Sequence, residues 1–310
     1  MEIINHFHAM KLSVVINTKN AAETLDGCLN SVGFADEIVI VDMHSFDKTK
    51  EIAQKYQAKF FFHDDVGYVE PARNYAIRQA THPLILVLDA DERVSEGLQK
   101  QIVKITKLSD PADVYLFPRK NIMFGQWIKH TGWWPDYQPR LFQKDKVQWS
   151  ETIHQPPTMK GRVVKLPIKE EFAILHQHYP NLHVYLERLN RYTSVQAENT
   201  LRGFSQPVEA TTLISTFFNE FFRRFFVFSG YKDDTAGVGL SFLQACYELS
   251  VQLKVWEYDK NHQNITKEKE IVGALEKSRS DLSYWLADWK VKNSTGIANF
   301  YWKLRRRIRF

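Results

Sequence analysis

Two carboxylates stand two residues apart at the end of a short apolar run. The run Leu84–Leu88 consists of five apolar residues, and Asp89, Asp91 and Glu92 follow it closely. A continuous apolar run of this length is typical of a strand buried on both faces, and side chains two apart on a strand point the same way. We therefore expect Asp89 and Asp91 to project together from the carboxyl end of a central strand, where open α/β sheets bind their ligands.

The chemistry that suits this pair is the binding of a divalent cation. Neighbouring carboxylates repel each other unless a cation lies between them or one of them takes up a proton. One or two carboxylates together with substrate phosphates are the usual ligands of a hard cation. The acid pair therefore predicts a metal–diphosphate site. The structural alternative is an acidic cluster in front of a helix that begins near Ser95, because acidic side chains are favourable at helix N-termini.

Strand and helix patterns alternate around the acid pair and must position it. Apolar runs predict four strands, over residues 12–17, 37–41, 59–63 and 84–88. Three predicted helices lie between them, over residues 21–32, about 45–57 and 71–80. This alternation is typical of a parallel sheet with right-handed crossovers. Asp42 ends the second strand, so two of these strands are expected to end in acids at the carboxyl edge.

Glycine loops that bind phosphates are not found where they would be expected. No Gly-x-Gly-x-x-Gly follows the first strand, and the sequence contains no Gly-Lys-Ser/Thr loop, which argues against a dinucleotide or P-loop site. A nucleotidyltransferase is also disfavoured, because Thr18-Lys19-Asn20-Ala21 stands where such an enzyme has a glycine-rich basic loop. Without a glycine cradle the phosphates need a metal, which the acid pair can supply.

The composition favours a globular protein with a basic end. The 310 residues are enough for one large domain, alone or with an appendage, and 44% of them are apolar. Five positive charges lie in the last eight residues without a nucleic-acid motif, so a membrane, and no nucleic acid, is the expected anionic partner. Cys28 and Cys246 lack a metal spacing, and no signal peptide or membrane-length apolar run is found. These features favour a cytoplasmic protein that is soluble or peripheral.

Four sequence blocks resemble the inverting family 2 glycosyltransferases of GT-A fold, and they occur in the order and spacing of that family. The blocks are Ser13–Asn20, Asp36–Asp42, Ala72–Ala76 and Leu88–Arg93. Two later segments, Trp134–Phe142 and Glu151–Gln155, are similar to the branch that contains lipopolysaccharide core β-1,4-glucosyltransferases. The resemblance implies an α/β GT-A fold with a mostly parallel sheet.

The resemblance also implies an activity and roles for the matching residues. The activity is metal-dependent, inverting transfer of a hexose, with glucose expected, from a UDP-sugar to a lipid-linked glycan such as lipopolysaccharide core. The implied cofactor is Mg²⁺ or Mn²⁺. The residues implied for the nucleotide-sugar are Thr18, Asn20, Asp42, Arg73 and Asp89, and those implied for the metal are Asp91, Asp89 and His176. On the residues alone, Arg73 could equally be a helix-surface arginine, and a lone histidine is more often structural.

The proton acceptor is expected in segment 121–160, which is rich in Trp, Gly, Pro and Tyr and is predicted to be loop-rich. In an inverting displacement one carboxylate takes the proton of the attacking hydroxyl, while the metal neutralises the leaving diphosphate. We prefer Asp136 to Glu151, because Asp136 lies in a loop similar to the family's acceptor loop. The branch often has a glutamate where this chain has Gln155, so the choice stays open. The residues expected to contact the acceptor are Trp134, Arg140 and His154.

The chain is expected to divide into a catalytic domain, residues 1–205, and a helical region, residues 206–310. Within the first, about 10–118 would hold the nucleotide-sugar and about 119–205 the acceptor. In the second, a predicted helix over 212–228 carries phenylalanines on one face and arginines on the other. That face could dock on the catalytic domain. Together with the basic C-terminus, it favours peripheral attachment to the inner face of the cytoplasmic membrane. The rival hypothesis is a non-catalytic, membrane-associated protein with the same fold.

Overall fold

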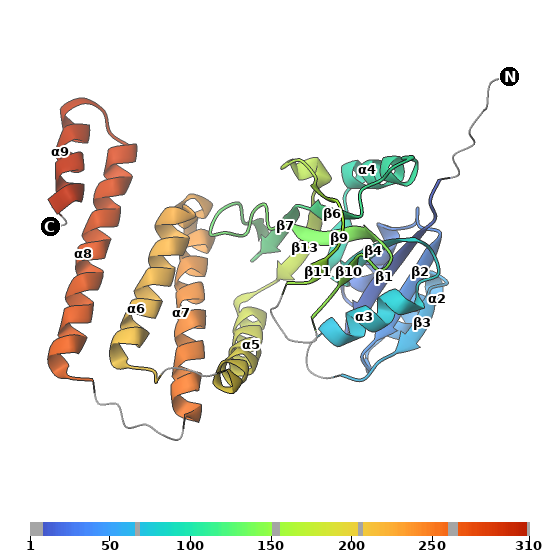
Figure 1. The fold of residues 1–310 in the computed structure, drawn as a ribbon, viewed down its shortest axis with the longest axis horizontal. Coiled ribbons are helices and arrows are strands. Elements are labelled where there is room, and N and C mark those ends of the chain that lie inside the picture. The colour runs from blue at the N-terminus through green and yellow to red at the C-terminus, as the bar shows by residue number, and fades with distance from the viewer. Residues whose placement is uncertain (1–8, 66–68, 151–155, 204–206, 260–265, 309–310) are drawn as a thin grey trace. The chain divides into compact units, whose positions relative to one another are not determined.

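The computed structural model describes residues 9–65, 69–150, 156–203, 207–259 and 266–308 (Figure 1). The chain forms two compact units. The first comprises Met1–Met123 and Trp134–His178, and the second comprises Phe124–Trp133 and Tyr179–Phe310. This division differs from the predicted boundary after residue 205, because the second unit begins earlier and takes in a short segment that interrupts the first.

A seven-stranded sheet forms the centre of the first unit. Its strands, in spatial order, are β12 (Val163–Lys165), β6 (Val114–Phe117), β9 (Gln138–Gln143), β4 (Leu84–Asp89), β1 (Leu12–Thr18), β2 (Glu37–Asp42) and β3 (Lys59–Phe62). Strand β9 runs antiparallel to both of its neighbours, and the other pairs are parallel. The predicted α/β class with a mostly parallel sheet is confirmed. The four predicted N-terminal strands are found to within about one residue at each end.

Helices alternate with the first strands and cover both faces of the sheet. They are α1 (Leu25–Asn30), α2 (Thr49–Lys55), α3 (Glu70–Gln79) and α4 (Glu96–Thr106). Every residue of β1 is buried. Ile16 packs in one cluster with residues of α1 and α4, and Val15 packs in another with residues of α3. Burial on both faces explains why these strands are continuous apolar runs.

The register of the parallel strands brings their carboxyl ends together. Asn17 of β1 lies opposite Asp89 of β4, and Thr18 lies opposite Asp42 of β2. The acids that end two of the strands are therefore close to the end of the strand between them. This is the sheet edge at which the sequence predicts a ligand.

A smaller sheet adds residues from distant parts of the chain. Strand β5 (Glu92–Val94) pairs antiparallel with β13 (Ile174–Tyr179), which places His176 opposite Glu92. Strand β13 also adjoins β7 (Arg119–Met123). The remaining short elements are β8 (Gln126–Trp127), β10 (Val147–Gln148), β11 (Thr158–Met159) and the 3-10 turn η1 (Glu170–Phe172).

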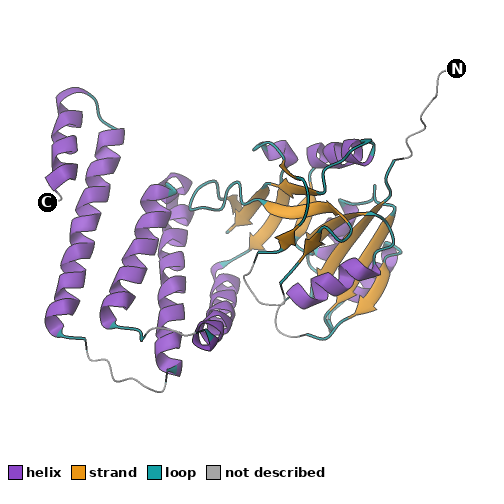
Figure 2. Cartoon of the chain, viewed as in Figure 1, coloured by secondary structure: helices purple, strands orange, loops and turns teal. Residues whose placement is uncertain are grey.

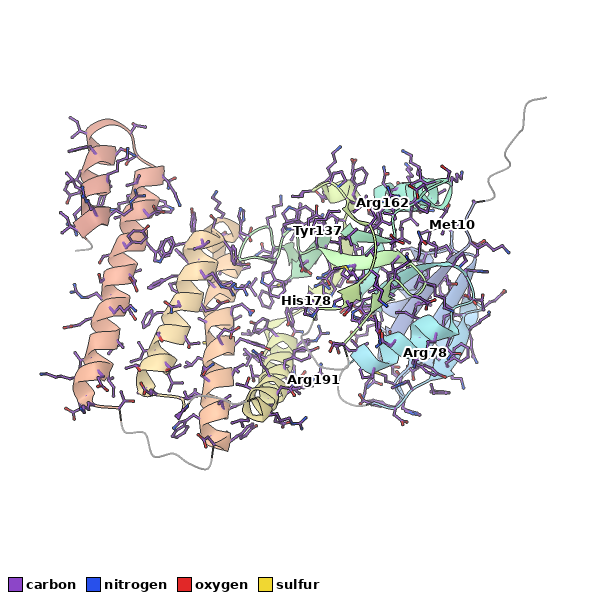
Figure 3. The ribbon with its side chains drawn as sticks, viewed as in Figure 1. Met10, Arg78, Tyr137, Arg162, His178 and Arg191 are labelled. Carbon is purple, nitrogen blue, oxygen red and sulfur yellow. The ribbon has the colours of Figure 1, made fainter. Side chains whose placement is uncertain are left out.

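The segment predicted to be loop-rich supplies β9 to the middle of the main sheet. Its sequence has no long apolar run, yet Leu141 and Phe142 are fully buried between β4 and β6. Strand formation here depends on those two neighbours, which a local pattern does not reveal. Just before β9, the hydroxyl of Tyr137 donates to the carbonyl of Leu166 at 2.6 Å and ties this part of the chain to the first unit (Figure 3).

The second unit is built mainly of helices (Figure 2). Its elements after Tyr179 are α5 (Leu182–Arg202), α6 (Ala210–Phe222), the π-helical turn η2 (Arg223–Val227), the 3-10 turn η3 (Gly230–Asp233), α7 (Asp234–Tyr258), α8 (Glu268–Lys292) and α9 (Gly296–Ile308). Helix α7 packs against α5 and α6, and α8 packs against α6 and α9. Within the described ranges, no helix combines the length and the apolar character needed to cross a bilayer.

The phenylalanine face of α6 and η2 is covered by other helices. Phe222 and Phe226 are buried. The ring of Phe221 stacks on that of Phe242 in α7 with centroids 4.5 Å apart, and Phe226 stacks on Trp285 of α8 at 5.8 Å. The expectation that this face is free to meet lipid is therefore wrong, because α7 and α8 pack against it.

Candidate active site

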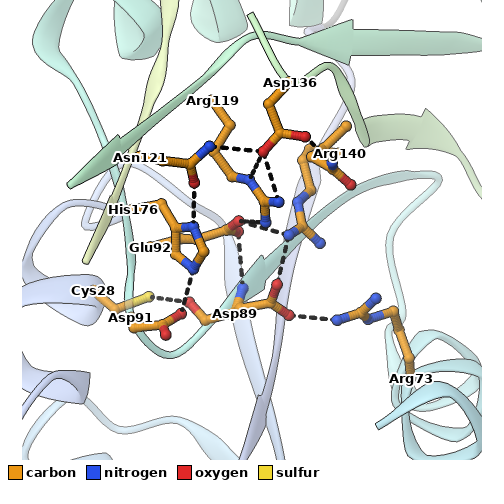
Figure 4. A network of polar contacts seen from close by, with 11 residues as sticks. Cys28, Arg73, Asp89, Asp91, Glu92, Arg119, Asn121, Asp136, Arg140 and His176 are labelled. Atoms are coloured by element: carbon orange, nitrogen blue, oxygen red, sulfur yellow. Dashed lines mark hydrogen bonds and ion pairs between the residues drawn. The ribbon is translucent and has the colours of Figure 1, made fainter. Parts of the chain in front are cut away.

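The centre of the site is Asp89, which ends β4 between two arginines (Figure 4). Nη2 of Arg73, from α3, donates to Oδ1 of Asp89, and Nη2 of Arg140, from β9, donates to Oδ2 at 2.6 Å. Burial by itself would raise the pKa of Asp89, but the guanidinium groups of Arg140 and Arg73 outweigh burial and hold that pKa well below its usual range. Asp89 is therefore a permanent anion that fixes both arginines.

Glu92 is the second anchor of the arginines, and sequence reasoning gave it no role. Its side chain is fully buried. Oε1 of Glu92 accepts from Nη2 of Arg140 at 2.6 Å and from Nη1 of Arg119 at 3.2 Å, while Oε2 accepts from the backbone N–H of Asp89 at 3.0 Å. Buried charges are tolerated only when they are paired and hydrogen-bonded, as they are here.

Asp91 has a different environment from Asp89. Because β13 pairs with β5, Nε2 of His176 lies 3.5 Å from Oδ1 of Asp91. The backbone N–H of Gln177 also donates to the carbonyl of Asp91 at 3.0 Å and holds the turn against β13. The side chain of His176 is only 5% exposed and that of Asp91 is 21% exposed. Asp91 thus presents its carboxylate toward an imidazole nitrogen at the accessible edge of the cluster.

Asp91 and His176 suit a cation that is shared with a substrate. In the described part of the chain, no group of three or more His, Cys, Asp or Glu side chains is arranged to hold a metal unaided. Asp91 and His176 offer one oxygen and one nitrogen, and a nucleotide-bound Mg²⁺ usually takes its other ligands from phosphates and water. Both oxygens of Asp89 already contact arginines, which makes Asp89 the less suitable ligand.

The loops after β1 and β2 join at a second polar cluster. Asp42 accepts hydrogen bonds from Oγ1 of Thr18 at 2.7 Å, and from the backbone N–H and Oγ of Ser45 at 2.7 and 2.6 Å. The side chain of Asn20 accepts from the N–H of Phe46 at 3.1 Å, and Asn20 has a φ of 48°. The structure thus brings the predicted residues Thr18, Asn20 and Asp42 together. Arg73 is also buried in the site and does not lie on an exposed helix surface.

Asn17 is a site residue that the sequence analysis did not select. It is 6% exposed, and neither polar atom of its side chain has a partner among the described residues. It lies opposite Asp89 in the sheet register. A buried amide without a partner costs stability, so its position beside Asp89 is suited to binding a polar ligand. The available signal was a polar residue directly after the apolar run Val14–Ile16.

Asp136 is enclosed by donors. Its Oδ2 accepts from Nε of Arg119 and Nδ2 of Asn121, each at 2.8 Å, and its Oδ1 accepts from Nε2 of Gln138 at 3.0 Å. Burial alone would raise the pKa of Asp136, but Arg119, helped by Asn121 and Gln138, lowers it. These contacts also hold Asp136 at a φ of 40°, in the left-handed region. A carboxylate with a lowered pKa is a weaker base.

Of the residues predicted to contact the acceptor, the structure describes Arg140 and Trp134. Arg140 is 3% exposed in its side chain and binds Asp89 and Glu92, so the structure makes it an internal anchor, which corrects the expectation of an acceptor contact. Trp134 is half-buried and lies two residues before Asp136 in the sequence. Glu151 and His154 lie outside the described residues.

The chain is similar to several known proteins. The sequence profile described as "Glycosyl transferase family 2" matches residues 13–165. An uncharacterized glycosyltransferase of Rickettsia bellii is 31% identical over 270 aligned residues, covering 78% of this chain and 88% of that protein. The lipopolysaccharide core biosynthesis glycosyltransferase LpsC of Rhizobium meliloti is 24% identical and covers 64% of this chain and 74% of that protein. Residues 1–349 of S. aureus TarS in complex with UDP match with a TM-score of 0.41 at 18% identity, over 83% of this chain and 95% of that one.

Proposed function

Because the chain belongs to glycosyltransferase family 2, we propose that it transfers a hexose, with glucose expected, from a UDP-sugar to a lipid-linked glycan. The observation that carries this proposal is the approach of His176 to Asp91 beside a buried cluster of arginines and acids. That arrangement suits a nucleoside diphosphate accompanied by its cation. The similarity to LpsC supports an acceptor of the lipopolysaccharide-core type.

We assign the nucleotide-sugar to the carboxyl ends of β1, β2 and β4. Thr18, Asn20 and Asp42 would contact the nucleoside. Arg73 would contact the diphosphate, and two features support this role. Its Nε is buried without a partner among the described residues, and a guanidinium fork matches phosphate oxygens well. Asp89 would act mainly by holding this arginine in place.

Asp91 and His176 would hold Mg²⁺ or Mn²⁺ at the diphosphate. When bound there, the ion neutralises charge on the departing nucleoside diphosphate. The protein's own contribution is to place one carboxylate and one imidazole at fixed positions and to keep Asp89 ionised. The hydroxyl of the acceptor would lose its proton to Asp136 or Glu151 during the displacement. The three donors around Asp136 weaken it for this task and favour Glu151.

The test is calorimetric titration of UDP into the protein with and without Mn²⁺. The wild-type protein should bind UDP more tightly with Mn²⁺ than without it. In Asp91→Asn the affinity for UDP in the presence of Mn²⁺ should fall by about tenfold or more, which removes most of that difference. Asp110→Asn is the matched control, because the side chain of Asp110 is 87% exposed and remote in sequence from the acid pair. Undiminished Mn²⁺ dependence in Asp91→Asn would refute the ion site. Tight UDP–Mn²⁺ binding without turnover of any UDP-sugar would favour the non-catalytic rival.

We also propose that the chain attaches peripherally to the inner face of the cytoplasmic membrane, and that α9 makes the contact. The exposed apolar side chains of this helix are Ile297, Phe300, Tyr301, Leu304 and Ile308. Four of them recur at intervals of three or four residues and so lie on one side of the helix. Exposed basic residues accompany them at Lys303, Arg305 and Arg307. An apolar face flanked by basic side chains is typical of a helix in the interface of an anionic bilayer.

The other side of α9 is attached to α8, which supports this division of the helix. Nη1 of Arg306 lies 2.6 Å from Oδ1 of Asp288, and Nζ of Lys290 lies 4.0 Å from the ring centroid of Trp302. Trp302 and Arg306 are both half-buried, whereas the apolar residues named above are exposed. The apolar residues named above have no such cover among the described residues, which makes α9 a better candidate than α6 for meeting lipid.

A further inference from the structure

We propose that Asn121 is a positioning residue that keeps the proton of the His176 ring on Nδ1, so that Nε2 faces Asp91 as a bare electron-pair donor. The inference rests on the proposed function in one respect only, the divalent cation that Asp91 and Nε2 would share. Asn121 belongs to β7 and His176 to β13, and these two strands adjoin in the smaller sheet.

A continuous chain of contacts connects Asp136 with Asp91 (Figure 4). Oδ2 of Asp136 lies 2.8 Å from Nδ2 of Asn121, and Oδ1 of Asn121 lies 2.6 Å from Nδ1 of His176. Nε2 of His176 then lies 3.5 Å from Oδ1 of Asp91. Asn121 is fully buried and His176 is 4% exposed, so water has little access with which to replace these contacts.

The direction of each hydrogen bond follows from the first member of the chain. An ionised carboxylate can only accept, so the atom of Asn121 that faces Asp136 must be its NH₂ group. The other amide atom is then the carbonyl oxygen, which can only accept, and Nδ1 of His176 must supply the hydrogen. In an uncharged imidazole, a proton on Nδ1 leaves a lone pair on Nε2. The ionised carboxylate of Asp136 thereby decides which amide atom of Asn121 is nitrogen and which is oxygen.

Asp136 is held ionised and in place by Arg119. Nε and Nη2 of Arg119 both lie 2.8 Å from Oδ2 of Asp136, and Nη1 of the same guanidinium lies 3.2 Å from Oε1 of Glu92. The ring of His178 packs on that of His176 with centroids 4.4 Å apart, which restricts rotation of the imidazole. Asp136 thus has a use in the site that differs from accepting the proton of the acceptor.

The position of the lone pair on Nε2 of His176 matters because this nitrogen would bind the metal. A metal-ligating histidine commonly donates its other ring N–H to a neighbouring acceptor. Such outer partners fix the tautomer and typically change metal affinity by about 10- to 100-fold when they are removed. Asn121 occupies that outer position here. A merely structural amide would stabilise the fold without determining where the ring proton lies.

The first measurement is the tautomer of His176 in the metal-free protein, by ¹⁵N NMR of histidine-labelled protein in mildly alkaline solution, where imidazole is uncharged. His176→Gln identifies the signal among the 11 histidines of the chain. We expect the proton on Nδ1 in the wild type and a loss of this single tautomer in Asn121→Leu. Asn121→Gln keeps an amide that can donate to Asp136 and accept from the ring, and should restore the Nδ1 proton. A wild-type ring that carries its proton on Nε2, or on both nitrogens, would overturn the inference.

The second measurement is the affinity for Mn²⁺ in the presence of UDP, from the electron paramagnetic resonance signal of free Mn²⁺. Asn121→Leu should weaken binding by about 10- to 100-fold, and Asn121→Gln should recover much of the loss. Thr193→Val is the matched control, because Thr193 is also a fully buried, hydrogen-bonded residue but belongs to α5, outside the site. It should leave tautomer and affinity unchanged.

The outcomes separate this inference from the proposed function. Unchanged tautomer and Mn²⁺ affinity in a folded Asn121→Leu protein would overturn the positioning role. If that variant does not fold, the tautomers of the wild type and Asn121→Gln still decide the question. A wild type with its proton on Nδ1 that binds no Mn²⁺ would support the inference about Asn121 and refute the ion site in the proposed function.

Discussion

At the scale of single residues, the two aspartates at the end of β4 differ in what surrounds them. Asp89 contacts two arginines, whereas Asp91 faces the imidazole of His176. Their spacing suggested a matched pair of ligands. The arginines instead make Asp89 an anchor and leave Asp91 as the more suitable ligand. The same residue type thus serves two purposes because the neighbouring charges differ.

Substitution of Arg140 tests whether it anchors the buried carboxylates of Asp89 and Glu92. Arg140→Met should lower the free energy of unfolding by about 3–5 kcal/mol, because Glu92 and Asp89 would stay buried after losing the cation that they share. Chemical denaturation measures this change. Arg162→Met is the control, since Arg162 pairs with Asp110 at 3.0 Å but its side chain is 54% exposed. That variant should change stability by less than about 1 kcal/mol. Equal losses in the two variants would contradict the anchoring role.

The identity of the base is also a question about single residues. Glu151→Gln should lower kcat by about 10²- to 10⁴-fold if Glu151 takes the proton, with Mn²⁺ affinity unchanged. Asp136→Asn should cost less in kcat, because the contacts that lower the pKa of Asp136 already make it a poor base. Steady-state kinetics and Mn²⁺ titration of both variants decide between them. A larger kcat loss in Asp136→Asn, without a change in Mn²⁺ affinity, would restore Asp136 as the base.

At the scale of elements, β5, β7 and β13 bring together residues that no local pattern connects. Asp91 precedes β5, Asn121 lies in β7, and His176 lies in β13. Among the helices, α6 and α9 are both amphipathic, but α6 is covered by α7 and α8, while the apolar side of α9 is exposed. An apolar helix face that packs against another helix is not available to a membrane. The exposed apolar side of α9 is therefore available, and the covered face of α6 is not.

If α9 contacts the membrane, a charged substitution in α9 should weaken vesicle binding and an equally exposed one in α5 should not. Leu304→Glu should weaken binding to vesicles that contain anionic lipid by about tenfold, because it removes apolar contact and adds a like charge. Leu186→Glu in α5 is the control, since Leu186 is 46% exposed and Leu304 is 45% exposed. Vesicle flotation measures both variants. Binding that is unaffected by Leu304→Glu, or reduced equally by the control, would contradict the assignment of α9.

At the scale of the whole molecule, the chain passes between its two units at residues 123–124, 133–134 and 178–179. The segment 124–133 interrupts the first unit and is fastened within the second. The backbone N–H of His130 donates to Oδ2 of Asp233 at 2.6 Å, and Nη1 of Arg224 donates to the carbonyl of Thr131 at 2.6 Å. Asn121 precedes this segment in the chain and Asp136 follows it.

The sequence alone determined the features that depend on local pattern. Apolar runs and acids at strand ends were enough to predict the parallel strands β1 to β4 and the sheet edge at which β2 and β4 end in Asp42 and Asp89, and the family resemblance is confirmed. Such features need only the periodicity of buried strands.

Only the tertiary structure decided the features that depend on pairing between distant segments. The contact of His176 with Asp91, the burial of Arg140 between two acids, and the cover over the phenylalanines of α6 all depend on which strands and helices pack together. The type and spacing of a residue indicate what it is able to bind. Its partners are chosen by packing across the fold, because hydrogen bonds and buried charges act only over a few ångströms.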